Sequence, residues 1–347
     1  MSQPIRIDLI SDTGTRPTPG MRRAMAEAEV GDEQRGEDPS VLALCERVAD
    51  LLGQEAALFL PSGTMCNQIA ILLHCRPGDE VIAAESAHIV GTEGAGAAVL
   101  AGSFVRPIAT SRGIFTGDDV AAAVRAPSAK TPRSRLVEVE QTSNRGGGAV
   151  WPLETLRGVA RAAKAHGLAL HMDGARLLNA SVATGVPAAD YAGLCDSAWL
   201  DLSKGLGCPA GGVLAGPADF IKEAWVWKFR LGGAMRQAGI LAAAGVYALD
   251  NHVDRMAEDH DNARRLWDGV AALPGVRMAH PDVPTNMVFF DVSETGRAAA
   301  DIGADLRGHG VRIGIQGPDL MRAVTHLDVD RAGIDGAVQA LGAVLAA

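Results

Sequence analysis

The sequence predicts an α/β fold in which helices flank a mostly parallel β-sheet, followed by a small C-terminal α+β domain. Three observations carry this prediction. Short apolar runs alternate with longer stretches of helical periodicity through most of the 347 residues. These runs are rich in apolar residues on both faces, which is typical of strands in a sheet covered on both sides. After about residue 250, the pattern changes to short strands and helices in mixed order.

Six apolar runs are expected to form the strands of the main sheet. They are residues 56–60, 80–85, 135–140, 168–173, 197–202 and 211–216. Helical periodicity fills the sequence between several of them, most clearly over residues 64–75 and 153–167. Because a helix between two strands favours a parallel pair, the succession predicts a sheet with both faces covered.

The C-terminal part begins within a long helical pattern from about Gly232 to Leu273. Strands are then expected over residues 285–292, 310–315 and 320–329, and helices over 296–309 and from Asp330. No Pro/Gly linker marks a boundary, so it is placed inside the long helical pattern. The expected organisation is an N-terminal segment, a large domain and a small C-terminal domain, over residues 1–20, 21–250 and 251–347.

The composition excludes several classes of protein. Hydrophobic residues make up 48% of the chain, which is enough for a large core, and the net charge of −9 disfavours nucleic acid or an anionic membrane as a partner. The five cysteines contain no CxxC pair, which argues against a disulfide framework or structural zinc, and no metal site is expected. The sequence lacks a signal peptide and any bilayer-length apolar run, so a cytoplasmic setting is expected.

The run at residues 56–60 ends in Ser62-Gly63-Thr64, which then opens a helix. Ligands of α/β sheets bind beyond the carboxyl ends of the strands. Gly63 allows close approach of a ligand, and the first N–H groups of the helix point toward it, with the Ser62 or Thr64 hydroxyl as a further donor. This stretch is therefore either an anion site suited to phosphate or an ordinary helix N-cap.

Three further polar groups follow other predicted strands. Asp173 ends a buried strand three residues before Arg176; the two form a simple ion pair, or Asp173 keeps a heteroaromatic nitrogen protonated while Arg176 holds a carboxylate. Lys204 stands in a glycine-rich turn; it is either a solvated loop cation or an amine that forms a Schiff base with a bulky cofactor, which small neighbours allow to approach. His88, just after residues 80–85, is either an ordinary surface or core histidine or one that stacks on a planar ring. A phosphate-ready turn, an aspartate, a lysine and a stacking histidine are together the groups that pyridoxal 5'-phosphate requires.

Nearly the whole chain resembles the L-threonine aldolases of the low-specificity and allo-threonine type, which are fold-type I pyridoxal-phosphate enzymes. The similar segments include "DLISDTGTRPTPGMRRAM", "VGDEQRGEDPSV", "EAALFLPSGTMCN", "AHIVGTEGAGAAVLAG", "HMDGARLLNA", "LSKGLGCPAGGVLAG", "GGAMRQAGILAAAGVYAL", "TNMVFF" and "RAVTHLDV". The resemblance implies a lyase that cleaves β-hydroxy-α-amino acids such as L-threonine or L-allo-threonine to glycine and an aldehyde. It also implies a homotetramer built from tight dimers.

The resemblance assigns roles to individual residues. Lys204 would carry the cofactor, Asp173 would pair with the pyridine nitrogen, and His88 would stack on the ring and is the candidate base. Ser62, Gly63 and Thr64 would hold the phosphate. Arg236 would be a further phosphate contact, within the same subunit or across a subunit boundary. Ser11, Arg176 and Arg322 would grip the substrate carboxylate.

Three positions depart from the family pattern on the side expected to face the substrate's β-substituent. Arg35 replaces a common tyrosine, Val90 replaces a common aromatic residue, and Ser143 replaces a second histidine that contacts the substrate hydroxyl. These changes are either neutral or reshape selectivity, with Arg35 favouring a substrate such as 3-hydroxyaspartate. Alternative functions are an aldolase or β-eliminating lyase for another β-hydroxy amino acid, such as phenylserine, and a non-catalytic binding protein that kept the fold.

Overall fold

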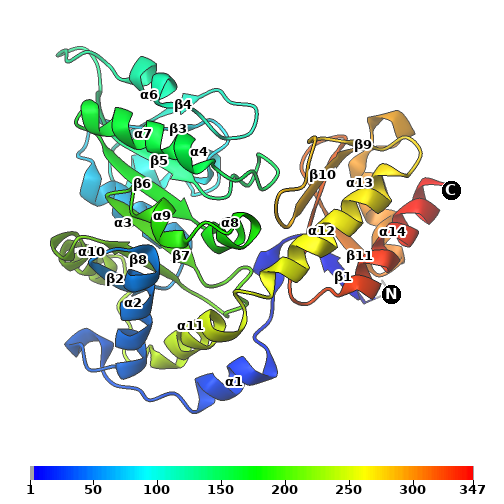
Figure 1. Ribbon diagram of the computed structural model, residues 1–347, viewed down its shortest axis with the longest axis horizontal. Helices are drawn as coiled ribbons and strands as arrows, with labels where there is room; N and C mark the ends of the chain where they lie inside the picture. The colour runs from blue at the N-terminus through cyan, green and yellow to red at the C-terminus, as the bar shows by residue number, and fades with distance from the viewer. Residues whose placement is uncertain (1–3, 347) are drawn as a thin grey trace. The chain divides into compact units, whose positions relative to one another are not determined.

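The computed structural model describes residues 4–346, which form two compact units (Figure 1). The larger unit is Pro17–Val253. The smaller unit joins the described residues up to Arg16 to those from Asp254 onward. The N-terminal residues therefore do not stand as a separate segment, because their strand pairs with one from the C-terminal part of the chain.

The larger unit contains a seven-stranded sheet in the order β2-β8-β7-β6-β5-β3-β4. The strands are β2 (Ala56–Leu60), β3 (Asp79–Ala84), β4 (Phe104–Ile108), β5 (Arg133–Glu140), β6 (Ala169–Gly174), β7 (Ser197–Asp201) and β8 (Gly212–Gly216). All pairs are parallel except those of β8, which runs antiparallel to both β2 and β7. The six strands expected from sequence are confirmed within two residues. Strand β4 was missed, since a proline interrupts it and it lies at the sheet edge.

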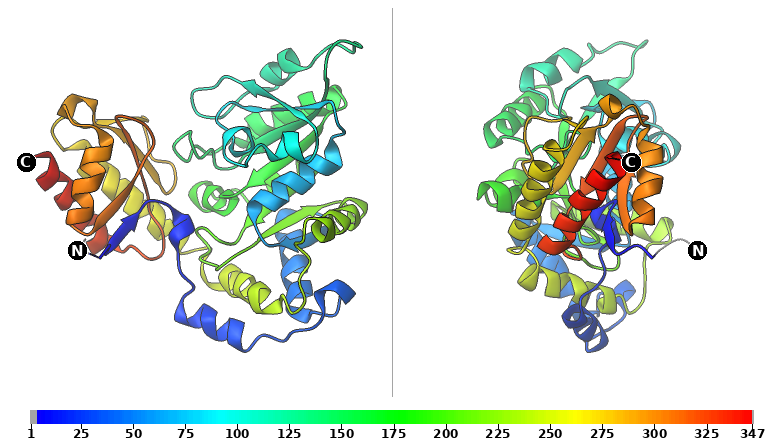
Figure 2. Two further views of the ribbon diagram at one scale, coloured as in Figure 1. Left: turned by 180° about the vertical axis from the view of Figure 1, so that it is seen from behind. Right: turned by 90° about the vertical axis from the view of Figure 1, so that its right-hand side faces the viewer.

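Helices cover both faces of this sheet (Figures 1 and 2). They are α1 (Pro19–Ala26), α2 (Pro39–Leu52), α3 (Gly63–His74), α4 (His88–Gly91), α5 (Gly96–Val99), α6 (Gly117–Ala123), α7 (Leu153–Ala165), α8 (Leu177–Thr184), α9 (Ala188–Ala192), α10 (Ala218–Arg230) and α11 (Gly239–Asn251). Helices α3 and α10 pack together on one face, where Trp199 and Leu214 point, and α7 lies on the other. No helix of residues 4–346 is long and apolar enough to cross a membrane.

The smaller unit is a five-stranded sheet in the order β1-β11-β12-β10-β9. Its elements are β1 (Ile7–Leu9), α12 (Met256–Ala271), β9 (Arg277–Met278), β10 (Met287–Asp291), α13 (Ala299–Gly308), β11 (Val311–Ile315), β12 (Leu320–Val324) and α14 (Arg331–Leu345). The three helices form one core with the sheet, into which Leu9, Phe290 and Met321 are buried. The last strand was expected over residues 320–329, but β12 is shorter and ends at Val324.

The long helical pattern from Gly232 to Leu273 is two helices, α11 and α12, rather than one. The helices are separated at residues 252–255, and the division between the two units falls there, after Val253. Helix α11 packs against α1 and α2 in the larger unit, while α12 packs against α14 in the smaller one. Periodicity continues across the break because both helices bury an apolar side, each against a different core.

Candidate functional site

The carboxyl ends of β2, β3, β5, β6 and β7 lie at one edge of the seven-stranded sheet. Strand β2 runs parallel to β7 because β8 is antiparallel to both. The polar segments that follow these strands therefore share that edge, as expected for the ligand site of such a sheet. Apart from Arg35 and Arg236, the predicted site residues of the larger unit follow one of these strands within six residues, or, in the case of Asp173, lie at the last position but one of the strand.

The first of these segments begins helix α3. Ser62 is the N-cap: its Oγ accepts a hydrogen bond from the backbone N–H of Met65 at 3.3 Å. This leaves the hydroxyl hydrogen able to donate, and the N–H groups of Gly63 and Thr64 lie in the first turn, where no intrahelical acceptor is available. The N-cap is therefore confirmed, and it uses different atoms from those an anion site would need.

Gly63 is required by packing as well as by access. A Cβ at this position would lie 2.1 Å from the ring of Trp199, which is buried on β7. Gly63→Ala is therefore expected to lower the free energy of unfolding by about 1–3 kcal/mol, the usual cost of overpacking. Urea unfolding measures this, with Gly308→Ala as the control, since a Cβ there meets nothing within 4 Å. Equal stability of both variants would contradict the packing argument.

Asp173 is the last residue but one of β6 and is buried. Its Oδ2 accepts a hydrogen bond from Asn67 Nδ2 at 2.7 Å, and its Oδ1 accepts one from the backbone N–H of Ala175 at 3.0 Å. The two donors fix the orientation of this buried carboxylate. Asp173 is thus held as an acceptor at the ligand edge of the sheet.

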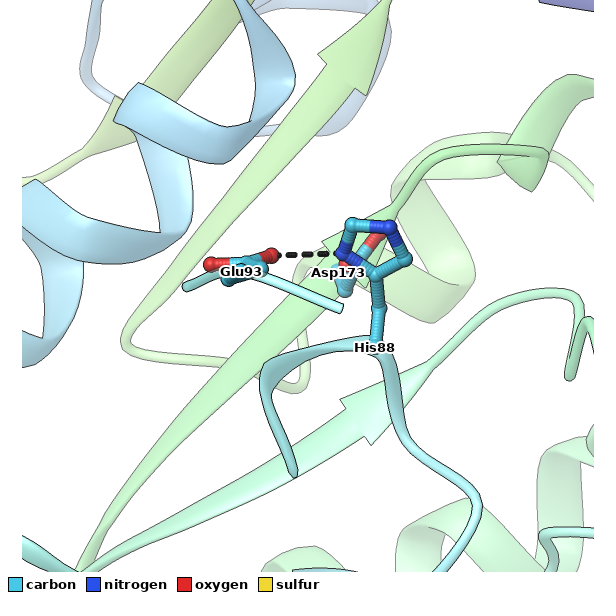
Figure 3. A group of neighbouring side chains, drawn as sticks. All are labelled: His88, Glu93 and Asp173. Carbon is cyan, nitrogen blue, oxygen red and sulfur yellow. Dashed lines mark hydrogen bonds and ion pairs between the residues drawn. The ribbon is translucent and has the colours of Figure 1, made fainter. Parts of the chain in front are cut away.

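His88 begins α4 and lies beside Asp173 (Figure 3). Its Nδ1 is 2.7 Å from Oε1 of the buried Glu93. This hydrogen bond raises the pKa of His88 above its ordinary value of 6.5; burial opposes the shift, and the charges of Asp173, Glu93 and Glu140 add to it. Since Nδ1 is bound to Glu93, Nε2 is the nitrogen that can act on a ligand.

The raised pKa of His88 makes part of the stability depend on pH. A histidine whose pKa is higher in the folded chain stabilises it fully below about pH 6.5, and this contribution disappears as the pH rises through the raised value. Glu93→Gln is therefore expected to lose more stability, relative to wild type, near pH 6 than near pH 9. Urea unfolding at both pH values tests this. Glu154→Gln, which removes an exposed pair with Arg157, is the control and should show a small loss at both.

Lys204 follows β7 and is largely buried, with 18% of its side chain exposed. Its Nζ lies 2.7 Å from Asp201 Oδ2 and 5.6 Å from the centre of the Trp199 ring. Trp199 also packs against Gly63 and donates from Nε1 to Asn67 Oδ1 at 2.7 Å. Trp199 and Asn67 thereby bring Lys204, Gly63 and Asp173 into one cluster.

The cluster carries an excess of buried carboxyl groups. Glu140, at the end of β5, accepts hydrogen bonds from the backbone N–H groups of His88 at 2.7 Å and Asn144 at 2.6 Å. Burial, with the charge of Asp173, raises the pKa of Glu140 to about 6, and burial raises that of the neighbouring Glu138 well above its ordinary range. A protonated heteroaromatic nitrogen beside Asp173 would offset part of this excess of carboxyl groups.

A metal ion fits the same place less well. One ligand atom each from His88, Glu93 and Asp173 lie within 4.8 Å of one another. However, Asn67 Nδ2 donates to Glu93 Oε1 and to Asp173 Oδ2, both at 2.7 Å. An amide N–H directed at two of the three groups competes with a cation for their oxygen atoms, so the arrangement suits a hydrogen-bond donor better than a metal.

Three other predicted residues follow the same strands. Arg176 is buried at the N-cap of α8, and its backbone N–H donates to the carbonyl of Gln141 at 3.0 Å. Ser143 is buried. Its Oγ packs closely against Gly113, so that a Cβ added to Gly113 would lie 2.1 Å from this Oγ. Val90 is exposed on α4. A histidine at position 143 would require the segment around Gly113 to move.

Arg35 and Arg236 lie together in a different part of the larger unit. Both are exposed, with 72% and 62% of their side chains accessible, and both approach Asp32, at 3.8 and 3.0 Å. The structure therefore joins these two arginines to each other and gives them no contact with the cluster around Trp199 among the hydrogen bonds and ion pairs described.

The smaller unit brings Ser11 and Arg322 together from opposite ends of the chain. Arg322 on β12 donates from a guanidinium N–H to the carbonyl of Ile10 at 3.1 Å, next to Ser11. Ser11 caps a short helix, where its Oγ accepts from the backbone N–H of Thr13 at 3.2 Å. Pairing of β1 with β11, the neighbour of β12, places them there.

The comparisons with known proteins agree with this geometry. Residues 8–293 match the family model described as beta-eliminating lyase. The low specificity L-threonine aldolase of Escherichia coli (strain K12) is 44% identical over 94% of this chain and 95% of its own length. The chain belongs to the beta-eliminating lyase family. It is a pyridoxal-phosphate-dependent lyase related to the L-threonine aldolases.

Further relatives support this membership. Low-specificity L-threonine aldolase 1 of Arabidopsis thaliana is 41% identical over 85% of this chain and 84% of its own. A threonine aldolase structure from Leishmania major has the same fold, with a TM-score of 0.83 at 24% identity, covering 98% of this chain and 99% of that chain. The fold of this lyase is that of the fold-type I pyridoxal-phosphate enzymes.

Sequence reasoning missed four residues that this lyase places at the site: Asn67, Glu93, Glu140 and Trp199. Each is buried and polar or aromatic, and each contacts a predicted site residue. One signal was available for Asn67, because it lies in the second turn of a largely apolar helix, where a buried amide must find a partner. The identity of that partner depends on which strands are adjacent.

Proposed function

We propose that this lyase cleaves L-threonine and L-allo-threonine to glycine and acetaldehyde. The observation that carries the proposal is the convergence of Lys204, Asp173, His88 and Gly63 around Trp199 and Asn67 at one sheet edge. The names of the relatives at 44% and 41% identity support the substrate. Bound pyridoxal phosphate would supply an electron-withdrawing pyridine ring that accepts the electron pair of the broken carbon–carbon bond.

The residues of the cluster have distinct roles in this proposal. Lys204 would hold the cofactor through its amine, which Asp201 orients from 2.7 Å. Asp173 would accept a hydrogen bond from the protonated ring nitrogen, and Ser62, Gly63 and Thr64 would bind the phosphate. Arg236, which lies away from this cluster in its own subunit, would reach the phosphate of a neighbouring subunit. His88 would stack on the ring, and its Nε2, directly or through a water, would take the proton of the substrate hydroxyl.

Ser11, Arg176 and Arg322 would bind the substrate carboxylate and so orient the amino acid. Bond cleavage is fastest for the bond perpendicular to the cofactor ring, so the carboxylate grip decides which bond breaks. An arginine pair suits this task because each guanidinium binds a carboxylate with two parallel hydrogen bonds.

The assembly and setting belong to the same proposal. A homotetramer built from tight dimers is supported by the exposed Arg35 and Arg236 and by exposed apolar side chains on nearby elements, namely Leu42, Val226, Phe229 and Ile240. A cytoplasmic, reducing setting is supported by the five cysteines, all of which are free thiols.

An absorbance spectrum and a coupled assay test the function. A visible band together with acetaldehyde release from L-threonine or L-allo-threonine, followed by NADH oxidation, is the expected result. The band with a keto acid and ammonia as products would indicate β-elimination, and the band without turnover would indicate another β-hydroxy amino acid. Absence of both the band and a borohydride-trapped adduct at Lys204 would indicate a non-catalytic protein.

Selectivity provides a separate test, at Arg35. If this exposed cation faces the β-substituent, Arg35→Tyr should raise kcat/KM for threonine and lower it for 3-hydroxyaspartate, each by about tenfold. Ser143→Ala is the companion variant, since it probes the position that replaces the family's second histidine. Unchanged kcat/KM for both substrates in Arg35→Tyr would exclude a role for Arg35 in selectivity.

A further inference from the structure

The amide of Asn67 is hydrogen-bonded on both sides and is completely buried. Its Oδ1 accepts from Trp199 Nε1 at 2.7 Å and lies 3.2 Å from His171 Nε2. Its Nδ2 donates to Asp173 Oδ2 and to Glu93 Oε1, both at 2.7 Å. The Asn67 side chain therefore contacts two carboxylates, that of Asp173 and that of Glu93, and Glu93 is hydrogen-bonded to His88.

The orientation of this amide is fixed by its neighbours. An indole N–H can only donate, so the atom that faces Trp199 must be the amide oxygen. The two N–H groups then face the two carboxylates, Asp173 and Glu93. Both carboxylates accept hydrogen bonds when ionised. Every donor and acceptor group of the Asn67 amide therefore has a partner in this orientation.

A chain of neutral groups supports Asn67 from behind. His171 must donate from Nε2 to Asn67, so its Nδ1 accepts from the hydroxyl of Ser197 at 2.8 Å. The Ser197 oxygen in turn lies 2.8 Å from His74 Nε2. Burial lowers the pKa of His171 to about 3 and that of His74 to about 4, so both imidazoles are neutral at physiological pH. Donors therefore point along the chain from His74 toward Asp173.

We propose that Asn67 is a positioning residue for the cofactor ring. By donating to Asp173 Oδ2, it directs that carboxylate at the ring nitrogen. By donating to Glu93, it fixes the glutamate that orients His88. The two contacts fix the position of the Asp173 carboxylate, the acceptor for the ring nitrogen, relative to the His88 imidazole. This inference rests on the proposed roles of Asp173 and His88.

The test compares binding of two cofactors to the apoenzyme by absorbance titration. One is pyridoxal phosphate, and the other is its carbocyclic analogue, in which a C–H replaces the ring nitrogen. Wild type is expected to bind pyridoxal phosphate at least about tenfold more tightly than the analogue, because only the former makes a charged hydrogen bond to Asp173. Asn67→Asp, which has nearly the same shape but no N–H groups, is expected to lose most of this preference.

Ser197→Ala is the matched control. It removes two buried hydrogen bonds of the same chain, those of Ser197 with His171 and His74, and Ser197 lies three hydrogen bonds from Asp173. It should therefore lower the melting temperature while the cofactor preference stays as in wild type. If Asn67→Asp does not fold, Asn67→Ser replaces it, since a hydroxyl can donate to only one of the two carboxylates.

The outcomes distinguish failure of the role of Asn67 from failure of the proposed function. If wild type shows no preference between the two cofactors, the proposed role of Asp173 fails, and the role of Asn67 fails with it. If wild type shows the preference and the Asn67 variants keep it in full, Asn67 has only a structural role and the proposed function stands. An equal loss of preference in Ser197→Ala would also overturn the specific role of Asn67.

Discussion

Replacing Lys204 with alanine is expected to lower kcat for threonine cleavage by at least about a thousandfold. The variant removes the amine that would bind the cofactor covalently and leaves Asp201 without its partner at 2.7 Å. The visible band of the bound cofactor should shift or vanish, and borohydride should no longer fix the cofactor to the chain. Steady-state kinetics and peptide mass spectrometry after reduction measure the two effects.

Lys204→Arg separates covalent chemistry from charge. Arginine retains the ion pair with Asp201, but its guanidinium stays protonated and does not attack an aldehyde. The variant is therefore expected to be as inactive as Lys204→Ala while unfolding at nearly the wild-type temperature. Appreciable activity in Lys204→Arg would show that the amine of Lys204 is not the group that binds the cofactor.

Lys228→Met is expected to lower the free energy of unfolding by about 3–5 kcal/mol, because it leaves a buried carboxylate without its counter-ion. Lys228 on α10 is completely buried and forms an ion pair with Oε1 of the buried Glu33. The rings of Trp225 and Phe59 lie 5.0 and 5.8 Å from its Nζ. Burial lowers the pKa of Lys228, and the contact with Glu33 opposes that shift.

The double variant Lys228→Met/Glu33→Met is the control. Removing both charges eliminates the desolvation cost together with the attraction, so most of the lost stability should return. Glu33 Oε2 also accepts from the backbone N–H of Met235 at 2.8 Å, so that N–H is left without its acceptor and recovery should be incomplete. Urea unfolding of the three proteins measures the coupling; a loss below about 1 kcal/mol in Lys228→Met would contradict the buried ion pair.

The same pair has a consequence for the exposed arginines. Glu33 belongs to a short 3-10 helix, Glu33–Arg35, and its backbone N–H donates to the carbonyl of Arg236 at 2.9 Å. The Lys228–Glu33 contact therefore stabilises the two segments that carry Arg35 and Arg236. Their expected roles in selectivity and phosphate binding depend on a buried charge pair that neither arginine touches.

The strands and the residues that follow them could be predicted from the sequence because their signals are local. Residues 56–60 are apolar throughout and residues 197–202 are mostly apolar, and both were expected close to where β2 and β7 lie. Ser62, Asp173 and Lys204 follow such strands directly, so a known sheet architecture was enough to place them at one edge. The N-cap at Ser62 was likewise readable from a hydroxyl residue before a helical pattern.

Other features could not be predicted, because they depend on which strands are neighbours. The three residues of β1 carry too weak a pattern to be recognised, and the strand forms by pairing with β11 some 300 residues later. The break between α11 and α12 was missed because each helix has an apolar side of its own. Lys228 reads as an exposed helical lysine until Glu33 is placed beside it.

The sequence by itself determined the order of strands and helices along the chain, the polar groups at the strand ends and, through its motifs, the family. These depend on periodicity and on residues close together in the chain. Only the tertiary structure decided that Asn67 joins Asp173 to Glu93, that Trp199 packs on Gly63, and that Lys228 pairs with Glu33. Buried polar groups must find partners wherever the fold places them, and the order of strands in a sheet, which sets those partners, is not written in any local pattern.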